Sequence, residues 1–144
     1  MPLIYLNCPE GTFSAQAKDA LTQDITRDGL AAERLPDTPF VRSTAWIFMK
    51  EYPAGAVYHG GKPGGTKIIS LEVNVAEGAL DEKAKVALLA SITAAVRKHA
   101  GLAPDALAPV YVIIREVQGS CWGFFGKPGS LDDLLHPPAG AGAF

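Results

Sequence analysis

The sequence has few of the residues that build disulfide frameworks or metal centres. Its 144 residues include only two cysteines, Cys8 and Cys121, which form no CxxC pair, and three widely spaced histidines. Disulfide-rich domains carry several cysteine pairs, and zinc sites need closely spaced Cys or His ligands. We therefore expect no disulfide framework and no metal ion.

Charge of one sign is also scarce. Thirteen Lys and Arg residues stand against fifteen Asp and Glu residues, for a net charge of -2, and the cations are scattered along the chain. A protein that binds nucleic acid needs a basic face against the phosphates. The sequence predicts no such face, so we expect no nucleic-acid partner.

Long apolar runs are missing as well. The residues from Met1 to Tyr5 carry no basic leader, and no run is long enough for a signal peptide or a membrane span. We therefore expect a cytoplasmic protein with no membrane partner. Hydrophobic residues make up 48% of the chain, which is enough for one core, and we expect a single domain over residues 1–144.

What the chain does have is a faint internal repeat. Each half reads as a strand, a Glu-Gly pair, a helix, a second strand ending in Glu, and a Gly. The Glu-Gly pairs are 67 positions apart (77 minus 10), and the strand-end Glu residues are 65 apart (116 minus 51). The landmarks are Glu10-Gly11, Glu51 and Gly61 in the first half, and Glu77-Gly78, Glu116 and Gly126 in the second. This spacing predicts two strand-helix-strand units, about 2–61 and 67–127, followed by a loose C-terminal tail, 128–144.

The second unit shows its helix and strands more clearly than the first. Asp81 suits the N-cap of a helix, and Gly101 suits its end. Residues 67–75 alternate between apolar and polar, as in a strand with one buried face, whereas residues 110–116 are apolar on both faces. The apolar stripes predicted to face the sheet are Val86, Leu89, Ile92 and Val96 in this helix, and Ala17, Leu21 and Ile25 in the first.

These units predict an α/β (α+β) fold, a tandem β-α-β repeat that forms a four-stranded sheet with two helices on one face. Strands joined through a helix run parallel, with a right-handed crossover. The other face of the sheet then needs a cover, because an exposed apolar face exceeds the patch that a soluble monomer tolerates. We therefore expect the chain to associate with copies of itself.

Pro2 is the first residue that suggests chemistry. A small second residue allows removal of Met1, which leaves a secondary amine at the start of the chain. An α-amino group has a pKa of about 8, and burial among apolar neighbours lowers it further. A neutral prolyl amine can take a proton from the carbon next to a carbonyl and return it elsewhere. The alternative is that Pro2 is only a structural residue, since proline at this position is common.

Several segments together resemble the tautomerase superfamily. Pro2-Leu3-Ile4, the strand 110–116 and Trp122-Gly123 are similar to the opening and closing strands of 4-oxalocrotonate tautomerase. The segment 53–61, with Gly64-Gly65 and Glu77-Gly78, is similar to the middle of cis-3-chloroacrylic acid dehalogenase, a fused two-unit member. The resemblance reaches to about Lys127. It implies a tautomerase/MIF-like fold duplicated in one chain, a homotrimer, no cofactor, and Pro2 as the catalytic residue.

The other functional positions of those enzymes do not carry over. The dehalogenase has a histidine, two arginines, a tyrosine and a glutamate where this chain has Gly29, Ala76, Ala79, Ile113 and Phe124. The arginines of 4-oxalocrotonate tautomerase are replaced at Thr12, Ala79, Trp46 and Tyr111, and only its pocket aromatic is kept, as Trp122. We therefore do not expect hydrolytic dehalogenation by that mechanism.

Three residues are candidates for substrate binding. Substrates in this superfamily are usually carboxylates, and the guanidinium of Arg115 can hold a carboxylate. Tyr111 shares a strand face with Arg115, and Trp122 is the retained aromatic. The alternatives are that Arg115 is a solvated residue at a strand end, and that the two aromatics belong to the core or to an interface.

The sequence thus predicts a small isomerase that needs no cofactor. The leading hypothesis is keto-enol tautomerisation by Pro2 of a small enol or unsaturated acid, with phenylenolpyruvate as an example. Loss of the family arginines predicts a substrate that is less acidic than a dicarboxylate. Hydration, dehalogenation or decarboxylation of a three-carbon unsaturated acid is one alternative, and a catalytically weak trimeric scaffold is another.

Overall fold

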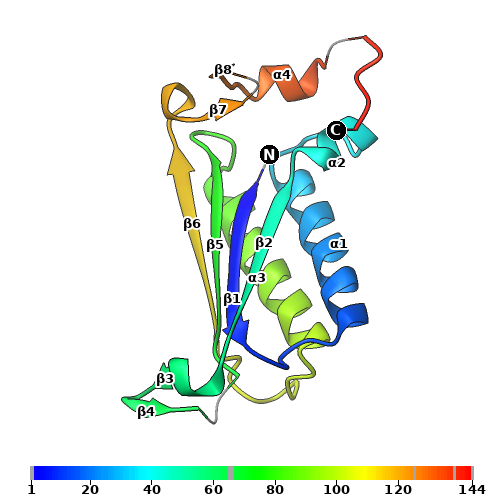
Figure 1. Ribbon diagram of the computed structural model, residues 1–144. Helices are drawn as coiled ribbons and strands as arrows, with labels where there is room; N and C mark the ends of the chain where they lie inside the picture. Colours follow the sequence, from blue (N-terminus) through cyan, green and yellow to red (C-terminus); the bar gives the residue numbers. More distant parts are fainter. Residues whose placement is uncertain (1, 65–66, 125, 138, 144) are drawn as a thin grey trace.

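The computed structural model describes residues 2–64, 67–124, 126–137 and 139–143. Met1, whose removal is predicted, and Gly65 lie outside the described residues. The main sheet has four strands in the order β2-β1-β5-β6, with the helices α1 and α3 lying side by side behind it (Figure 1). This architecture confirms the predicted fold class.

Each half of the chain supplies two strands and one helix to this architecture. The first unit contains β1 (Leu3–Pro9), α1 (Ala15–Ala32) and β2 (Trp46–Tyr52), and the second contains β5 (Ile69–Ala76), α3 (Glu82–His99) and β6 (Val110–Val117). The strands within each unit are parallel, and β1 pairs antiparallel with β5 at the centre of the sheet. The predicted parallel pairing within each unit is therefore confirmed.

The tandem repeat extends to the small elements. Helix α3 begins and ends 67 positions after α1 (82 minus 15 and 99 minus 32). A short 3-10 turn and a small hairpin follow β2, and a matching pair follows β6 at an offset of 65 (119 minus 54). These elements are η1 (Ala54–Ala56), β3 (Tyr58–His59) and β4 (Lys62–Pro63), then η2 (Gly119–Cys121), β7 (Gly123–Phe124) and β8 (Lys127–Pro128).

Capping residues set the helix ends where the sequence indicates them. The Asp81 carboxylate accepts a hydrogen bond from the Ala84 backbone N–H at 2.8 Å, and the Ser14 hydroxyl accepts one from Ala17 at 3.1 Å. After α3, Gly101 adopts a φ of +64°, which disfavours any residue with a Cβ. The predicted cap and end of the second helix are thus confirmed.

The core lies between the sheet and the two long helices. Ile4 and Leu6 of β1 face it, as do Leu71, Val73 and Val75 of β5. Alternation along each strand places these side chains on the helix side. From the helices, the core receives Leu21 and Ile25 of α1 together with Leu88, Ile92, Ala95 and Val96 of α3.

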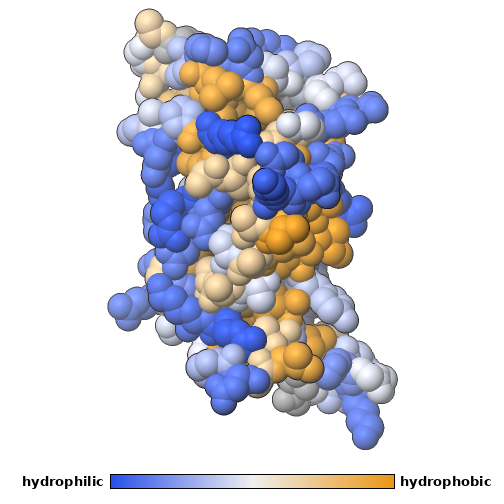
Figure 2. Space-filling model, turned by 180° about the vertical axis from the view of Figure 1, so that it is seen from behind, coloured by the Kyte–Doolittle hydropathy of each residue, from blue (hydrophilic) through white to orange (hydrophobic). Residues whose placement is uncertain are grey.

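One predicted stripe is wrong in part. Val86 is 67% exposed and Leu89 is 36% exposed, whereas Leu88 is buried. The sequence offers two overlapping apolar stripes in this Ala- and Leu-rich helix, and the one through Leu88 and Ile92 faces the sheet. Val86 and Leu89 lie on the helix side of the molecule, where apolar patches alternate with hydrophilic side chains (Figure 2).

The opposite face of the sheet carries large apolar side chains that none of the described elements covers. Trp46 and Phe48 of β2 are 52% and 54% exposed, and the ring of Tyr5 stacks on Phe48 with centroids 5.6 Å apart. Tyr111 and Ile113 of β6 continue the face on the far edge. This face is the one predicted to need a cover.

The C-terminal tail packs against the rest of the chain through Leu134. It contains α4 (Asp132–Leu135), and Leu134 is fully buried in a small cluster with Leu30, Leu35 and Val41. This packing differs from the loose end expected over 128–144. Helix α2 (Pro39–Ser43) contributes Val41 to the same cluster. Among the described residues, no helix is long and apolar enough to span a bilayer.

Candidate active site

Pro2 is buried at the start of β1, where the chain enters the sheet. The Trp46 backbone N–H donates to the Pro2 carbonyl at 3.1 Å, which fixes Pro2 beside the start of β2. The Pro2 ring fills the space that a side chain at Gly29 would need, since a Cβ on Gly29 would lie 3.0 Å from Pro2 Cγ. The close approach of β1 to α1 at this point therefore favours glycine.

The repeat indicates where the Pro2 nitrogen points. Ile69 matches Pro2 in the second unit (69 minus 67 is 2), and its backbone N–H donates to the Pro109 carbonyl at 2.9 Å. The residue that matches Pro109 in the first unit is Thr44 (109 minus 65 is 44). Thr44 is buried, and its hydroxyl donates to the Val41 carbonyl at 2.7 Å. Since the Pro2 carbonyl accepts from Trp46 of β2, we expect the nitrogen of Pro2 to lie on the same side of β1, toward Thr44.

Glu33 is a buried carboxylate that the sequence reasoning missed. It is the C-cap of α1, its residue is only 5% exposed, and its backbone N–H donates to the Gly29 carbonyl at 3.1 Å. One signal was available in the sequence. An acidic residue at the C-terminal end of a helix opposes the helix dipole, so a glutamate there needs another reason.

Arg115 shares the Pro2 end of the sheet. In the strand register it pairs with Asn74, which pairs in turn with Leu3. The Arg115 guanidinium contacts the Glu72 carboxylate, with Nε and Oε2 3.2 Å apart, and more than half of its side chain is exposed. The Asn74 amide donates to the Leu3 carbonyl at 3.0 Å. Arg115 is thus near the start of β1, but on the uncovered face.

Tyr111 and Trp122 lie at different ends of the chain's sheet. Tyr111 pairs in register with Ser70, which is opposite Asn7, so it lies four residues along β6 from Arg115, a distance of about 13 Å. Trp122 directly precedes β7, and β7 lies at the end of the molecule where the chain begins (Figure 1). Within one chain, the structure brings Trp122 and Arg115 to the Pro2 end, and it places Tyr111 away from them.

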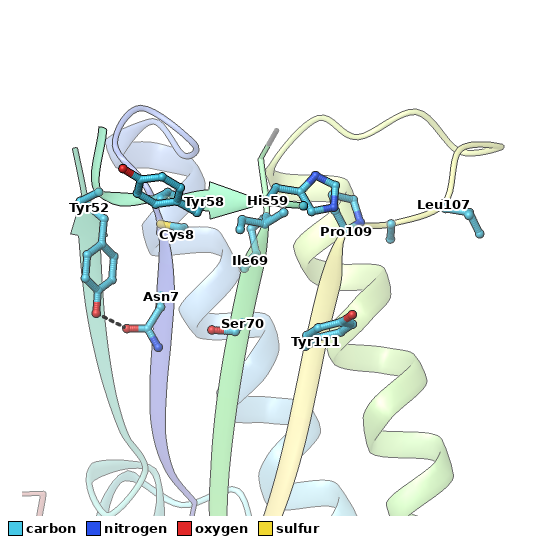
Figure 3. A pocket seen from close by; sticks show the side chains of 15 residues that line it. Asn7, Cys8, Tyr52, Tyr58, His59, Ile69, Ser70, Leu107, Pro109 and Tyr111 are labelled. Carbon is cyan, nitrogen blue, oxygen red and sulfur yellow. Dashed lines mark hydrogen bonds between the residues drawn. The ribbon is translucent and has the colours of Figure 1, made fainter. Parts of the chain in front are cut away.

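A cavity of about 770 Å³ lies at the Tyr111 end (Figure 3). Ile69 lines it, together with Tyr58 and His59 of the first hairpin and Tyr111 of β6. The Tyr52 hydroxyl donates to the Asn7 side-chain oxygen at 3.2 Å across one wall. Pro2 is not among the lining residues, and the nitrogen of Ile69 is an ordinary amide that cannot exchange a proton in catalysis. Within one chain, this cavity therefore does not contain the prolyl amine.

The cavity contains a thiol that is poorly suited to nucleophilic catalysis. Cys8 lines it and is buried. Burial raises the pKa of the Cys8 thiol, and the nearby Glu51 carboxylate raises it as well. A raised pKa keeps the sulfur protonated at neutral pH and less reactive.

The repeat relates this cavity to the Pro2 end. Asn7 and Val57 correspond to Asn74 (7 plus 67) and Trp122 (57 plus 65). Tyr111 corresponds to Trp46 (111 minus 65). The Pro2 end thus carries an amide and two indole rings around the start of β1. A secondary amine, a buried carboxylate, an arginine and aromatic rings at one end of a sheet can hold a small planar acid and move a proton on it.

The residues that the structure describes include no cluster of three or more His, Cys, Asp or Glu side chains that could hold a metal ion. The groups gathered at the Pro2 end are an amine, a carboxylate, a guanidinium and aromatic rings.

Residues 70–130 match the tautomerase family, described as tautomerase enzyme. The match lies in the second unit and the hairpin that follows it, and it does not include Pro2. No curated protein sequence matches the chain significantly.

Solved structures match nearly the whole chain. A fused 4-OT, F6, described as an asymmetric trimer, is 21% identical with a TM-score of 0.72, over 87% of this chain and 94% of that one. Pt0534, solved after inactivation by 2-oxo-3-pentynoate, is 19% identical with a TM-score of 0.74, over 90% and 96%. N1, of the cis-3-chloroacrylic acid dehalogenase family, is 19% identical with a TM-score of 0.73, over 90% and 87%. At these sequence identities the similarity shows a shared fold and nothing more.

Proposed function

We propose that this chain, whose residues 70–130 match the tautomerase family, is a cofactor-independent keto-enol tautomerase with the Pro2 amine as general acid and base. The observation that carries the proposal is the position of Pro2. It is buried at the start of a central strand, against the glycine of α1, at the end of the sheet that also holds Arg115 and Trp122.

The reaction needs only one group that can take and return a proton. Once Met1 is removed, the neutral Pro2 amine takes a proton from a carbon next to the substrate carbonyl and becomes a cation. The electron pair left on carbon moves into the carbonyl to form the enol. In the opposite direction, the cation protonates the enol carbon and the ketone forms. A positioned acid/base group contributes about 10² to 10⁴ to such a rate.

Self-association completes the proposed site. The aromatic side chains on the uncovered sheet face are the surface that another copy would bury. A fused 4-OT of the same fold is described as a trimer, and we infer a homotrimer for this chain. Since Tyr111 is far from Pro2 within one chain, it can reach a substrate only when a neighbouring subunit supplies it.

The proposed substrate is a small enol with one carboxylate. Arg115 is the arginine that we assign to that carboxylate, and Trp122 the ring that we assign to the substrate's apolar part. Glu72 already contacts Arg115, so a carboxylate must compete with Glu72 for the guanidinium. Phenylenolpyruvate has one carboxylate and an aromatic ring, and it suits this set of residues.

The proposal is tested by following ketonisation of phenylenolpyruvate by ultraviolet absorbance. Pro2→Ala should lower kcat/KM by about 10²-fold or more, because the general acid/base is altered. Ile69→Val is the matched control in the second unit, where the nitrogen is an amide, and it should retain the rate. An unchanged rate in a folded Pro2→Ala variant would remove the proposal.

A further inference from the structure

We propose that Glu33 is the counter-ion of the Pro2 amine, a positioning residue that holds the amine in its protonated form. The inference rests on the proposed function, because it concerns the group that moves the proton there. It starts from the burial of a carboxylate one helical turn beyond the glycine that contacts Pro2.

The geometry of α1 directs Glu33 toward Pro2. Glu33 stands directly above Gly29 in the helix, since its N–H donates to the Gly29 carbonyl at 3.1 Å. Helical side chains lean back over the preceding turn, toward residue i−4. For Glu33 that residue is Gly29, which has no side chain, and the space beside it holds the Pro2 ring. The carboxylate is thereby aimed at the start of the chain.

The second unit provides an internal comparison. At the offset of 67, Pro2, Gly29 and Glu33 correspond to Ile69, Val96 and Ala100. The backbone geometry is the same, because the Ala100 N–H donates to the Val96 carbonyl at 2.8 Å. Where the chain has no free amine, the matching positions of the same fold hold apolar side chains. The buried carboxylate occurs together with the proline.

Burial strengthens the electrostatic effect of the Glu33 carboxylate on neighbouring charges. A carboxylate removed from water is costly unless a cation or hydrogen-bond donors meet it. An amine at the start of the chain can supply that positive charge. In return, an opposite charge within about 4–6 Å raises the pKa of an amine by about one to three units. This effect opposes the lowering of the Pro2 pKa by burial alone.

The other charged groups around this end lie nearer the solvent. Arg34 is 80% exposed and contacts Asp81 at 2.6 Å, and such surface pairs are screened by water. The exposed Glu77 follows β5. Other pairs on the described elements near this end include Arg42 with Asp37 from α2, Lys85 with Glu116 from α3 and β6, Arg115 with Glu72, Lys127 with Asp133, and His136 with Asp132 from α4.

A protonated Pro2 determines which direction the free enzyme is ready to catalyse, without changing the equilibrium between enol and ketone, and it affects which substrates bind. The cation is a proton donor, so the enzyme is set to protonate the enol carbon and form the ketone. The Pro2 cation and the Glu33 anion cancel each other, which leaves no net positive charge for a second carboxylate. The site therefore takes a monocarboxylic enol and disfavours a dicarboxylate.

The test is an NMR titration of the Pro2 nitrogen in protein made with ¹⁵N-labelled proline, after intact mass has shown that Met1 is absent. In Glu33→Gln, the Pro2 pKa should fall by about one unit or more relative to the unaltered protein. The pH at which kcat/KM changes should fall with it. Glu82→Gln, an exposed change on α3, is the control and should move neither.

A second variant covers the case in which Glu33→Gln does not fold. Glu33→Asp keeps the charge but withdraws it by one methylene, and it should produce a smaller fall in the Pro2 pKa. Equal Pro2 pKa values in the folded variants and the unaltered protein would overturn the role of Glu33, even if Pro2→Ala still abolishes ketonisation. Conversely, a shifted pKa with a rate that does not depend on Pro2 would overturn the proposed function alone. Retained Met1 would overturn both.

Discussion

The position of the Pro2 ring depends on Gly29. A Cβ at this position would lie 3.0 Å from Pro2 Cγ, so the ring or the helix must shift by a few tenths of an ångström to accept alanine. Within a helix, however, alanine is favoured over glycine by about 0.5–1 kcal/mol. Gly29→Ala should therefore displace Pro2 without lowering the stability of the fold.

Gly29→Ala should lower kcat/KM by about tenfold or more, because small displacements of a catalytic group are costly. The free energy of unfolding in urea should change by less than about 1 kcal/mol. Gly55→Ala is the control, since a Cβ there meets nothing within 4 Å, and it should retain both values. A Gly29→Ala enzyme with full activity would show that Pro2 is not the reacting group or that its position is not critical.

Site residues differed in how well the sequence predicted them. The burial of Pro2 could be predicted, because a strand pattern follows it directly; its catalytic role stays a prediction. Glu33 could not, since only the folded chain shows that the end of α1 meets the start of β1. Tyr111 and Arg115 share a strand face, as expected, but the antiparallel pairing of β1 with β5 places Tyr111 far from Pro2.

At the scale of elements, Asp24 joins the two long helices. Its carboxylate on α1 contacts Nε2 of His99 on α3 at 2.8 Å, and Arg27 of α1 at 2.8 Å. The His99 side chain is only 9% exposed. Hydrogen bonds from His99, then Arg27, hold the pKa of Asp24 well below its usual range. Ionised Asp24 is therefore part of the α1–α3 contact.

Asp24→Asn should lower the free energy of unfolding at pH 7 by about 1–3 kcal/mol, the usual range for a hydrogen bond to a charged group. Because the folded pKa of Asp24 is depressed, its contribution is complete above the unfolded value of about 3.9 and is lost as the pH falls below it. Urea unfolding at pH 7 and at lower pH should therefore show the variant and the unaltered protein converging in acid.

Asp19→Asn is the control for this prediction. Asp19 is an exposed aspartate on the same helix, so its substitution should leave the free energy of unfolding nearly unchanged. If the difference in unfolding free energy between Asp24→Asn and the unaltered protein stayed constant as the pH was lowered, the role assigned to the ionised carboxylate would be contradicted.

The elements themselves were largely predictable because the repeat constrains them twice. The Glu-Gly pairs fix the end of the first strand in each unit, and the caps at Ser14 and Asp81 lie at the same offset. The buried stripe of α3 was less predictable. Ala and Leu occupy so many of its positions that periodicity alone does not choose between Leu88 and Leu89, and packing against the sheet decides it.

At the scale of the whole molecule, the uncovered sheet face distinguishes a monomer from an assembly. Phe48→Glu places a charge beside Tyr5 on that face. Val86→Glu makes the same change on the helix side, where the side chain is 67% exposed. The two positions are both exposed in the single chain, so their comparison locates the surface that is buried between subunits.

Phe48→Glu should convert the proposed trimer to a monomer in sedimentation equilibrium, because a buried unpaired carboxylate opposes association. Ketonisation should be lost with it, since Tyr111 then cannot reach a neighbouring Pro2. Val86→Glu should keep both the mass and the rate. Dissociation by Val86→Glu alone would place the interface on the helix side instead.

The most direct test of the account is to ask whether the chain begins at an imino nitrogen that reacts. An electrophilic ynone such as 2-oxo-3-pentynoate, with which one protein of similar fold is inactivated, should add once per chain. Intact mass and peptide mapping should show Met1 absent and the adduct on the Pro2 nitrogen, with activity lost in proportion to labelling. Retention of Met1 would contradict the proposed mechanism. Labelling at another residue, in a protein whose activity does not depend on Pro2, would contradict it as well.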